Sequence, residues 1–435
     1  MIRNPVVAGQ FYPGEAGQLR STIKKMVQEN APRTAAVGVI VPHAGYVYSG
    51  RVAGAVFSRI EFRDTCIVMG PNHTGNGVPF SIMTEGTWKT PLGDVEIDSE
   101  LGKKILSSSK YLKEDFPALQ NEHSIEVQLP FLQYFREDIK IVPLVFGPAG
   151  TDVYQAIGLE IARAVMELNK KVLIVASSDM THYEPQEEAL RKDNQAIQAI
   201  LELNEKELSR RVHSLDISMC GFAPVVSLIA AAKMLGAGGA ELVKYQTSGD
   251  TTGDNSSVVG YAGIIIKEMS PITRLAKATV ESYVTTGKLP KVKELVPEMK
   301  DRAGVFVSIH KHGELRGCIG TFEPTQPNVA GEIMTNAVSS ATEDPRFLPI
   351  SGEELGDLDY SVDVLTKPEP VADKTLLDPR KYGVIVQSGW RRGLLLPDLE
   401  GVETVDHQID ICRQKAGIAS DEPVNLHRFQ VRRYK

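Results

Sequence analysis

Short apolar runs rich in β-branched residues alternate with helical patterns along the first two-thirds of the chain. These runs predict strands at residues 37–41, 65–69, 139–146 and 171–176. Between them, apolar residues recur every three or four positions, which predicts helices at 50–60, 100–108, 122–135 and 154–168. A helix at 223–235 and strands at 241–246 and 258–266 follow. This alternation predicts an α/β domain with a largely parallel sheet.

The pattern changes near residue 269, where Ser270 and Pro271 suit the N-cap and the first position of a new helix. A chain of 435 residues is long for a single core, so we expect two domains, 1–268 and 271–435. The second should hold helices at 272–285, 329–341 and 404–415, and strands at 304–310, 314–322, 359–365, 383–387, 393–396 and 425–432. Strands in neighbouring hairpins, set apart from the helices, predict an α+β fold.

Composition is that of an ordinary globular protein, with 42% hydrophobic and 24% charged residues. A net charge of −7 argues against a nucleic-acid partner, which would need cations to neutralise phosphates. No apolar run approaches the roughly 18 residues of a membrane span, and the first residues resemble no signal peptide. The four cysteines are far apart and form no CxxC pair. We therefore expect a cytoplasmic protein with reduced thiols, and no membrane or nucleic-acid partner.

Three predicted strands of the first domain end in residues able to do chemistry. His43 and His73 each follow a strand beside Pro or Gly, and a third strand runs into Ser177-Ser178-Asp179. Ligands of open parallel sheets bind at the carboxyl ends of the strands, and neutral imidazole is a common ligand of divalent metals. The two histidines are therefore candidate metal ligands. The alternative is that each histidine caps a strand end or bonds a carbonyl.

Four further residues are candidates near the same edge. Cys220 precedes a helix whose amides would favour a thiolate, although on the sequence alone a buried small residue is the favoured interpretation. His123 opens a helix and is a candidate for orienting a ligand or carrying a proton. Asp179 and His182 fit a carboxylate that orients an imidazole general base. Alternatively, Asp179 caps its own turn.

The segment Leu315–Gly320 of the second domain carries an arginine and a cysteine on one strand. Arg316 and Cys318 share a parity, so they should face the same way. The guanidinium would favour a thiolate and could hold a carboxylate or a phosphate. The alternative is that the two glycines allow close packing and Cys318 belongs to the core.

Several motifs of residues 1–268, taken together and in order, resemble the Memo family. They are Gly9-Gln10-Phe11-Tyr12-Pro13, Pro42-His43-Ala44-Gly45-Tyr46, Gly70-Pro71-Asn72-His73, Glu122-His123-Ser124-Ile125-Glu126, Ser177-Ser178-Asp179 and Cys220-Gly221. The resemblance implies a fold like that of class III extradiol dioxygenases, which are non-haem iron enzymes. It implies metal-ligand positions at His43, His73 and Cys220, and pocket positions at Asp179 and His182. Iron(II) is the expected ion, with another divalent metal as the alternative. The dioxygenases use two histidines and a carboxylate, so a thiolate would make a softer site.

Residues 271–435 resemble the AMMECR family through three motifs: Leu315-Arg316-Gly317-Cys318-Ile319-Gly320, Asp344-Pro345-Arg346-Phe347, and the run from Gly389 to Pro397. The fusion is similar to components A and B of the AmmeMemoRadiSam system, which implies a radical-SAM protein as partner. The leading hypothesis is a metal-dependent redox enzyme that acts on a small molecule or a peptide. The alternatives are a non-catalytic ligand- or protein-binding adaptor and a metal-dependent hydrolase.

Overall fold

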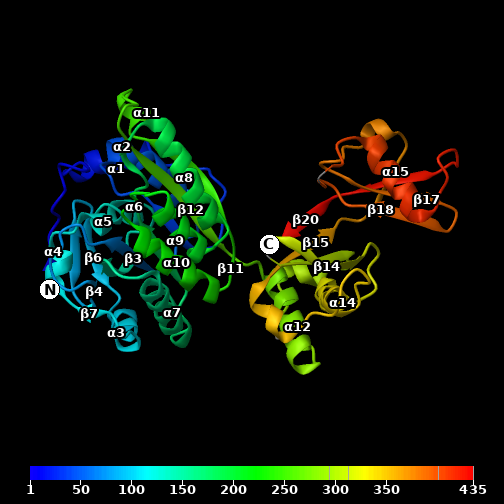
Figure 1. Ribbon diagram of the computed structural model, residues 1–435, viewed down its shortest axis with the longest axis horizontal. Helices are drawn as coiled ribbons and strands as arrows, with labels where there is room; N and C mark the ends of the chain where they lie inside the picture. The colour runs from blue at the N-terminus through cyan, green and yellow to red at the C-terminus, as the bar shows by residue number, and fades with distance from the viewer. Residues whose placement is uncertain (293, 312, 400, 435) are drawn as a thin grey trace. The chain divides into compact units, whose positions relative to one another are not determined.

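The computed structural model describes residues 1–292, 294–311, 313–399 and 401–434. The chain forms two compact units, Met1–Glu268 and Met269–Lys435 (Figure 1). Each unit has its own sheets and its own apolar clusters. Within the described residues, no helix is both long and apolar enough to cross a membrane.

The N-terminal unit is built on a mixed sheet of twelve strands, most of which lie in the order β1-β5-β6-β8-β3-β9-β2-β12-β10. Four central strands run parallel, namely β8 (Lys140–Phe146), β3 (Thr65–Pro71), β9 (Val172–Ser177) and β2 (Ala36–Val41). Strand β12 (Val258–Glu268) is antiparallel to β2 and pairs with β11 (Ala237–Thr247). The predicted α/β class and its largely parallel core are confirmed.

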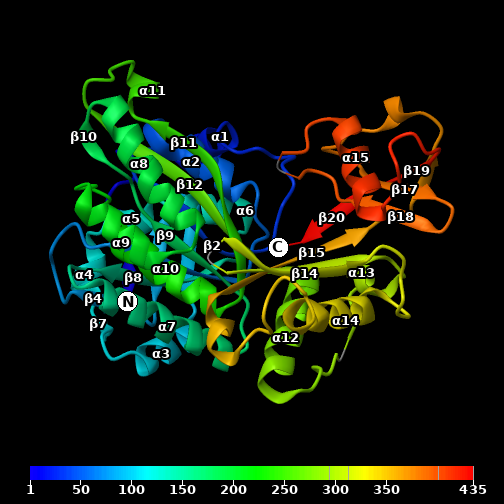
Figure 2. The ribbon, with the colours of Figure 1, turned by 45° about the vertical axis from the view of Figure 1, so that its right-hand side comes forward.

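Both faces of this sheet are buried, because successive residues of a strand point to opposite sides. In β3, Ile67 and Met69 join one apolar cluster, whereas Cys66 and Val68 join the other. One face is covered by α3 (Ser99–Ser108), α7 (Thr151–Glu167), α8 (Gln186–Leu201), α9 (Glu205–Ser214) and α10 (Phe222–Met234). Helices α7 and α10 lie side by side in both views (Figures 1 and 2). The other face is covered by α1 (Ala16–Lys24), α2 (Tyr46–Phe57), α4 (Phe116–Gln120), α5 (His123–Glu126) and α6 (Leu129–Phe135).

The predicted helix 122–135 is two helices, α5 and α6, since Pro130 stands in the first turn of α6 and marks a new start. The segment between the strands predicted at 241–246 and 258–266 contains the short helix α11 (Gly249–Thr252). Several short strands carry too few residues for a clear periodicity, and the sequence did not indicate them. They are β1 (Ile2–Arg3), β4 (Phe80–Ile82), β5 (Thr87–Thr90), β6 (Gly93–Ile97), β7 (Lys113–Glu114) and β10 (His182–Glu184).

The C-terminal unit contains two four-stranded antiparallel sheets, in agreement with the predicted α+β class. One sheet has the order β14-β13-β15-β20 and the other β16-β19-β17-β18. Their strands are β13 (Val305–Lys311), β14 (Glu314–Thr321), β15 (Leu358–Leu365), β16 (Glu369–Val371), β17 (Gly383–Ser388), β18 (Arg391–Leu395), β19 (Asn425–Phe429) and β20 (Val431–Tyr434). The single strand predicted at 425–432 is wrong. The chain leaves one sheet after Phe429 and enters the other at Val431.

Helices pack on each of these sheets (Figure 1). Helices α12 (Pro271–Thr286) and α14 (Val329–Thr342) accompany the first sheet, and α15 (Val405–Ala416) accompanies the second. The predicted cap of α12 is confirmed, because Ser270 accepts a hydrogen bond from the amide of Thr273 and Pro271 opens the helix. The remaining helical turns are α13 (Pro297–Lys300) and the 3-10 turns Gly352–Asp357 and Lys374–Leu376.

Candidate metal centre

Three neighbouring strands deliver polar residues to one edge of the N-terminal sheet. Strands β3, β9 and β2 lie side by side and run parallel, so their carboxyl ends meet. His73 follows the end of β3 by two residues, Ser177 ends β9, and His43 follows the end of β2 by two residues. Parallel strands thus bring together residues that are distant in the chain.

Helix α5 adds a third histidine, because a glycine lets it approach the sheet. A Cβ on Gly70, in β3, would lie 2.2 Å from the Ser124 hydroxyl oxygen. Only glycine therefore allows this packing, which sets Glu122 and His123 beside His73. Glu122 Oε1 accepts a hydrogen bond from the amide of Ser124 and so caps α5.

His43, His73 and His123 form a compact cluster. Each offers a ring nitrogen, and these nitrogens all lie within 4.8 Å of one another. The ring centroids are 5.1 Å apart for His43 and His73, 4.7 Å for His73 and His123, and 5.6 Å for His43 and His123. The His43 residue is buried, whereas the side chains of His73 and His123 are 33% and 24% exposed. The cluster is therefore shielded from solvent at His43 and accessible to solvent at His73 and His123.

Hydrogen bonds determine which ring nitrogen of His43 is free. The Ser177 hydroxyl donates its proton to the Ser124 carbonyl at 2.7 Å. It must then accept from His43 Nδ1, which lies 2.9 Å away. His43 consequently carries its proton on Nδ1 and keeps the lone pair of Nε2.

The same reasoning applies to His73. Its Nδ1 lies 2.9 Å from Glu122 Oε1, and its backbone amide donates to Glu122 Oε2 at 2.7 Å. Burial alone would raise the pKa of the Glu122 carboxyl, but the hydrogen bond and charge of His73 and the Ser124 amide lower that pKa to about 2. A carboxylate can only accept, so His73 also carries its proton on Nδ1 and keeps Nε2 free. A carboxylate behind an imidazole in this way is a common support of metal-binding histidines.

Burial favours the neutral form of His43 and His123, which is the form that binds a metal ion. Burial lowers the pKa of His43 well below its ordinary value, and the neighbouring histidines lower it further. Burial likewise lowers the pKa of His123, against the opposing charge of Glu122. Neutral imidazoles above a buried carboxylate form an environment that attracts a cation. The residues present therefore fit a divalent metal ion.

Cys220 lies beside His43 and outside the group of three histidines. Its Sγ is 3.2 Å from His43 Nε2 and accepts a hydrogen bond from the amide of Asp179, also at 3.2 Å. A Cβ on Gly221 would lie 2.4 Å from the Ser177 carbonyl oxygen, so glycine is needed for this approach. Burial raises the pKa of the Cys220 thiol, and the charge of Asp179 raises it further. This is opposite to the predicted effect of the helix start, because burial outweighs the nearby amides. A bound metal cation would reverse that preference.

Asp179 and His182 each have a hydrogen-bond partner other than the predicted one. Asp179 Oδ1 instead accepts a hydrogen bond from the backbone amide of His43 at 2.8 Å, which fixes the end of β2. The His182 ring is oriented by the Ser218 carbonyl, 2.9 Å from its Nδ1, and therefore also presents Nε2. Burial raises the pKa of the Asp179 carboxyl to about 6, although the amides of His43 and Ala44 oppose this.

A buried network joins the start of the chain to α5, and local sequence patterns gave no sign of it. Arg3 forms an ion pair with Glu126, and both side chains are fully buried. Arg3 also donates to the Glu122 carbonyl at 2.6 Å and lies 4.4 Å from the Trp88 ring. Glu126 accepts further hydrogen bonds from the Tyr12 hydroxyl and the amides of residues 6 and 7. These contacts hold the α5 backbone, and with it His123 and Glu122, in place.

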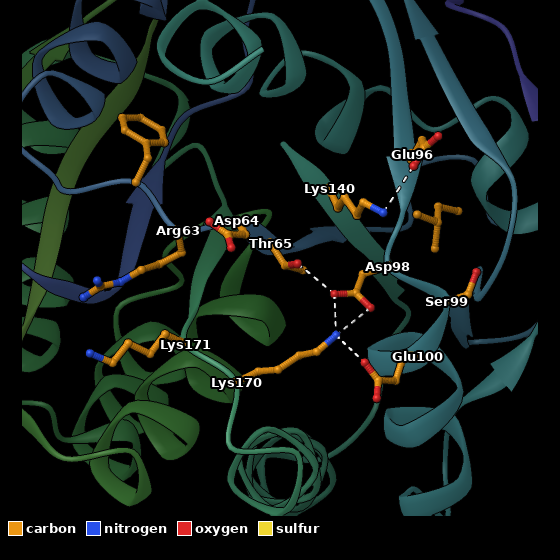
Figure 3. Close-up of a pocket in the computed structure, with 12 residues that line it drawn as sticks. Arg63, Asp64, Thr65, Glu96, Asp98, Ser99, Glu100, Lys140, Lys170 and Lys171 are labelled. Atoms are coloured by element: carbon orange, nitrogen blue, oxygen red, sulfur yellow. Dashed lines mark hydrogen bonds and ion pairs between the residues drawn. The ribbon is translucent and has the colours of Figure 1, made fainter. Parts of the chain in front are cut away.

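The opposite edge of the sheet carries a cavity of about 780 Å³, and Figure 3 shows Lys170 pointing at Asp98 and Glu100, and Lys140 at Glu96. Lys170 Nζ lies 2.9 Å from Asp98 and 2.8 Å from Glu100. Lys140 Nζ lies 3.3 Å from Glu96. These charges largely satisfy one another, so this edge is a less suitable ligand site than the histidine cluster.

In the C-terminal unit, Arg316 and Cys318 have different partners. Arg316 binds Glu354 through two nitrogens, each at 3.0 Å, and this pair lowers the pKa of the Glu354 carboxyl to about 2. Cys318 Sγ lies 3.3 Å from the Ser308 hydroxyl. The arginine beside Cys318 is Arg346, which donates to the Cys318 carbonyl at 3.1 Å. Glu354 thus holds the Arg316 guanidinium, and Arg346 is the arginine whose contact with Cys318 is seen.

The fold and the cluster define an α/β protein with a candidate metal site where parallel strands end. The family model of Memo-like proteins matches residues 3–265 and that of AMMECR1 matches residues 273–435. The chain thus belongs to the Memo-like protein family and has a two-domain Memo and AMMECR1 architecture.

Two MEMO1 family proteins agree with the Memo assignment. A MEMO1 family protein of Methanococcoides burtonii is 48% identical over 273 residues, which covers 61% of this chain and all of that protein. A MEMO1 family protein of Desulfurococcus amylolyticus is 44% identical over 277 residues, covering 60% of this chain and 98% of the relative. The crystal structure of an uncharacterised protein from Pyrococcus horikoshii is 31% identical in sequence and has a TM-score of 0.35. The match covers 37% of this chain and 88% of that protein's chain.

Proposed function

We propose that the N-terminal unit is a metal-dependent enzyme whose ion binds at the carboxyl edge of the sheet. His43 and His73 are its first two ligands, and the third comes from His123 or from Cys220. The observation that carries this proposal is the set of three imidazoles whose ring nitrogens lie within 4.8 Å of one another. Iron(II) is the expected ion, by the family's resemblance to non-haem iron enzymes, with another divalent metal as the alternative.

The two candidates for the third ligand differ in chemistry. His123 belongs to the compact group and is partly exposed, so it suits either a ligand or a proton carrier. The Cys220 sulfur lies 3.2 Å from His43 Nε2, a spacing compatible with two donors of one ion. A divalent ion would activate water or substrate as a Lewis acid, and iron would add redox chemistry.

The remaining residues have supporting roles in this proposal. Ser177 and Glu122 fix the rings of His43 and His73, and Asp179 fixes the backbone of His43. His182, with Nε2 free, is the proposed proton carrier for a small-molecule or peptide substrate. A redox reaction performed with a radical-SAM partner is the overall function that the resemblance favours. In that proposal, the surface around Arg316 and Cys318 serves the second substrate or the partner.

The test is metal analysis of the full chain after anaerobic purification in the presence of iron(II). Wild type should hold close to one ion per chain, and His43→Ala and His73→Ala should each lose most of it. His123→Ala and Cys220→Ser identify the third ligand. It is the residue whose substitution removes the ion. His213→Ala is the matched control, because His213 is exposed on α9.

Unchanged metal content in both His43→Ala and His73→Ala would disprove the site. A full ion with turnover of hydrolysable esters or amides, and no redox activity, would favour the hydrolase alternative. A full ion without turnover of any substrate supplied, together with tight binding of a protein or ligand, would favour the adaptor.

A further inference from the structure

A second cavity, of about 780 Å³, opens inside the C-terminal unit between its two sheets. Leu365, at the end of β15, and Ile385, in β17, contribute its apolar lining, and Phe322 lies beside them. All three belong to the apolar cluster that joins the two sheets. We call this cavity the inter-sheet cleft. Its volume is that of a small-molecule site.

The charged lining of the inter-sheet cleft is mainly cationic. Arg302, Lys367 and Arg392 line it, together with His427, whereas Glu323 is the carboxylate among the lining residues. This excess of positive charge contrasts with the chain as a whole, whose net charge is −7. A cationic cavity with an apolar floor suits a ligand that is both anionic and apolar.

Arg392 is held by a contact that a ligand can replace. Its Nη1 lies 2.6 Å from Glu323 Oε1, and the two side chains are 39% and 66% exposed. This ion pair links β18, in one sheet, to the segment after β14, in the other. An ion pair so exposed stabilises a fold little, so a better-placed anion can take over the guanidinium.

The chain segments that connect the two sheets are fixed to each other. The Thr366 amide donates to the Gln430 carbonyl at 2.9 Å, and the Gln430 amide donates to the Thr366 hydroxyl at 2.9 Å. These bonds hold the crossing from β15 to β16 against the crossing from β19 to β20. The inter-sheet cleft is thus preformed, which reduces the entropy lost when a ligand binds.

We propose that the inter-sheet cleft is a binding site for a small organic anion, separate from the metal centre. The flat apolar part of the ligand rests on Leu365, Ile385 and Phe322. Its carboxylate or phosphate is bound by Arg392, Lys367 and Arg302. Arginine suits both anions because its planar guanidinium donates two parallel hydrogen bonds.

The test begins with calorimetric titration of the full chain with 1-naphthyl phosphate and 1-naphthoate, which share an apolar ring and differ in the anion. Inorganic phosphate and 1-naphthol each lack one half of this chemistry. At least one organic anion should bind about 10-fold more tightly than either control, because it uses both halves of the cleft. Preference for one anion identifies the natural group. Equal binding of inorganic phosphate, or no binding of either organic anion at millimolar concentration, would overturn the proposal.

Two substitutions with opposite expected effects on affinity test whether the anion binds in the inter-sheet cleft. Arg392→Gln should weaken the binding of the tighter-binding anion about 5- to 20-fold, because it removes a charge-assisted hydrogen bond. Glu323→Gln should tighten it about 2- to 5-fold, since it removes both the competitor for Arg392 and a repelling charge. Arg380→Gln, an exposed arginine of the same unit outside the cleft lining, is the matched control and should change nothing.

These positions are exposed, so each variant should fold, and a thermal unfolding curve checks this. If binding is the same in Arg392→Gln as in wild type, or weaker in Glu323→Gln, the anion does not bind in the inter-sheet cleft.

Discussion

The two edges of the N-terminal sheet hold their ionisable side chains in opposite ways. At the amino edge, Lys170 is bound by Asp98 and Glu100, so positive and negative charges face each other. At the carboxyl edge, three imidazoles are grouped, and the buried Glu122 carboxylate supports that of His73. A set of charges that cancels internally has little need of a ligand. Grouped imidazole donors beside a buried negative charge, in contrast, are arranged to bind a cation.

Arg3→Met should give the largest effect, because it removes the cation from a fully buried ion pair and leaves Glu126 alone. The free energy of unfolding should fall by about 3–5 kcal/mol. Urea denaturation measures this. Arg20→Met, which breaks an exposed ion pair with Glu137, is the control and should cost about 0–1 kcal/mol. Similar costs for the two substitutions would mean that burial of the Arg3 pair does not matter.

Asp179→Asn should change how stability depends on pH in the metal-free protein. The folded-state pKa of Asp179 is about 6 against an ordinary 3.8, so its ionisation opposes folding. The contribution of the Asp179 carboxyl to the free energy of unfolding is full below about pH 4. It is lost as the pH rises through about 6, and the free energy of unfolding then falls by about 3 kcal/mol. Asparagine cannot ionise, so the variant should lack that loss. Unfolding curves at several pH values test this, and parallel pH profiles for the two proteins would contradict it.

Glu122→Gln should weaken metal binding about 10- to 100-fold, because the charge behind His73 disappears while an oxygen acceptor remains. Competition with a chelator of known affinity measures the change. Glu100→Gln removes a carboxylate from the amino edge and should leave metal affinity unchanged. If Glu100→Gln weakened metal binding as much as Glu122→Gln, the contrast between the two edges would be lost.

Lys170→Met should have the smallest effect. Its ion pairs are partly exposed, so the free energy of unfolding should fall by about 1 kcal/mol. Metal content should stay at the wild-type value, since Lys170 is at the edge opposite the histidines. Combined urea denaturation and metal analysis test both statements. Loss of metal in this variant would show that the two edges are coupled.

Much of the fold could be predicted from local pattern. The parallel core strands and the helices between them follow from periodicity, because burial on both faces of a sheet requires nearly continuous apolar runs. The strand predicted at 425–432 was wrong for an equally physical reason. Its residues favour extended structure throughout, and only pairing with different neighbours separates β19 from β20.

The candidate site was predictable only in part. His43 and His73 could be selected because each follows a buried strand. The place of His123 depends on the close packing of Gly70 against Ser124 and on the buried Arg3–Glu126 pair. An arginine at position 3 looks like an ordinary surface charge, so no local pattern connects it with α5.

The amino-acid sequence by itself determined most of the longer elements, the α/β class and the strand ends at which chemistry is placed. Those properties depend on residues only a few positions apart. The tertiary structure alone decided which donors meet, which nitrogen of His43 carries the proton, and whether burial or the helix start controls the pKa of Cys220. These depend on partners far away, as with Cys220 and His43, which are 177 residues apart. Desolvation and charge act through space, and the folded chain sets those distances.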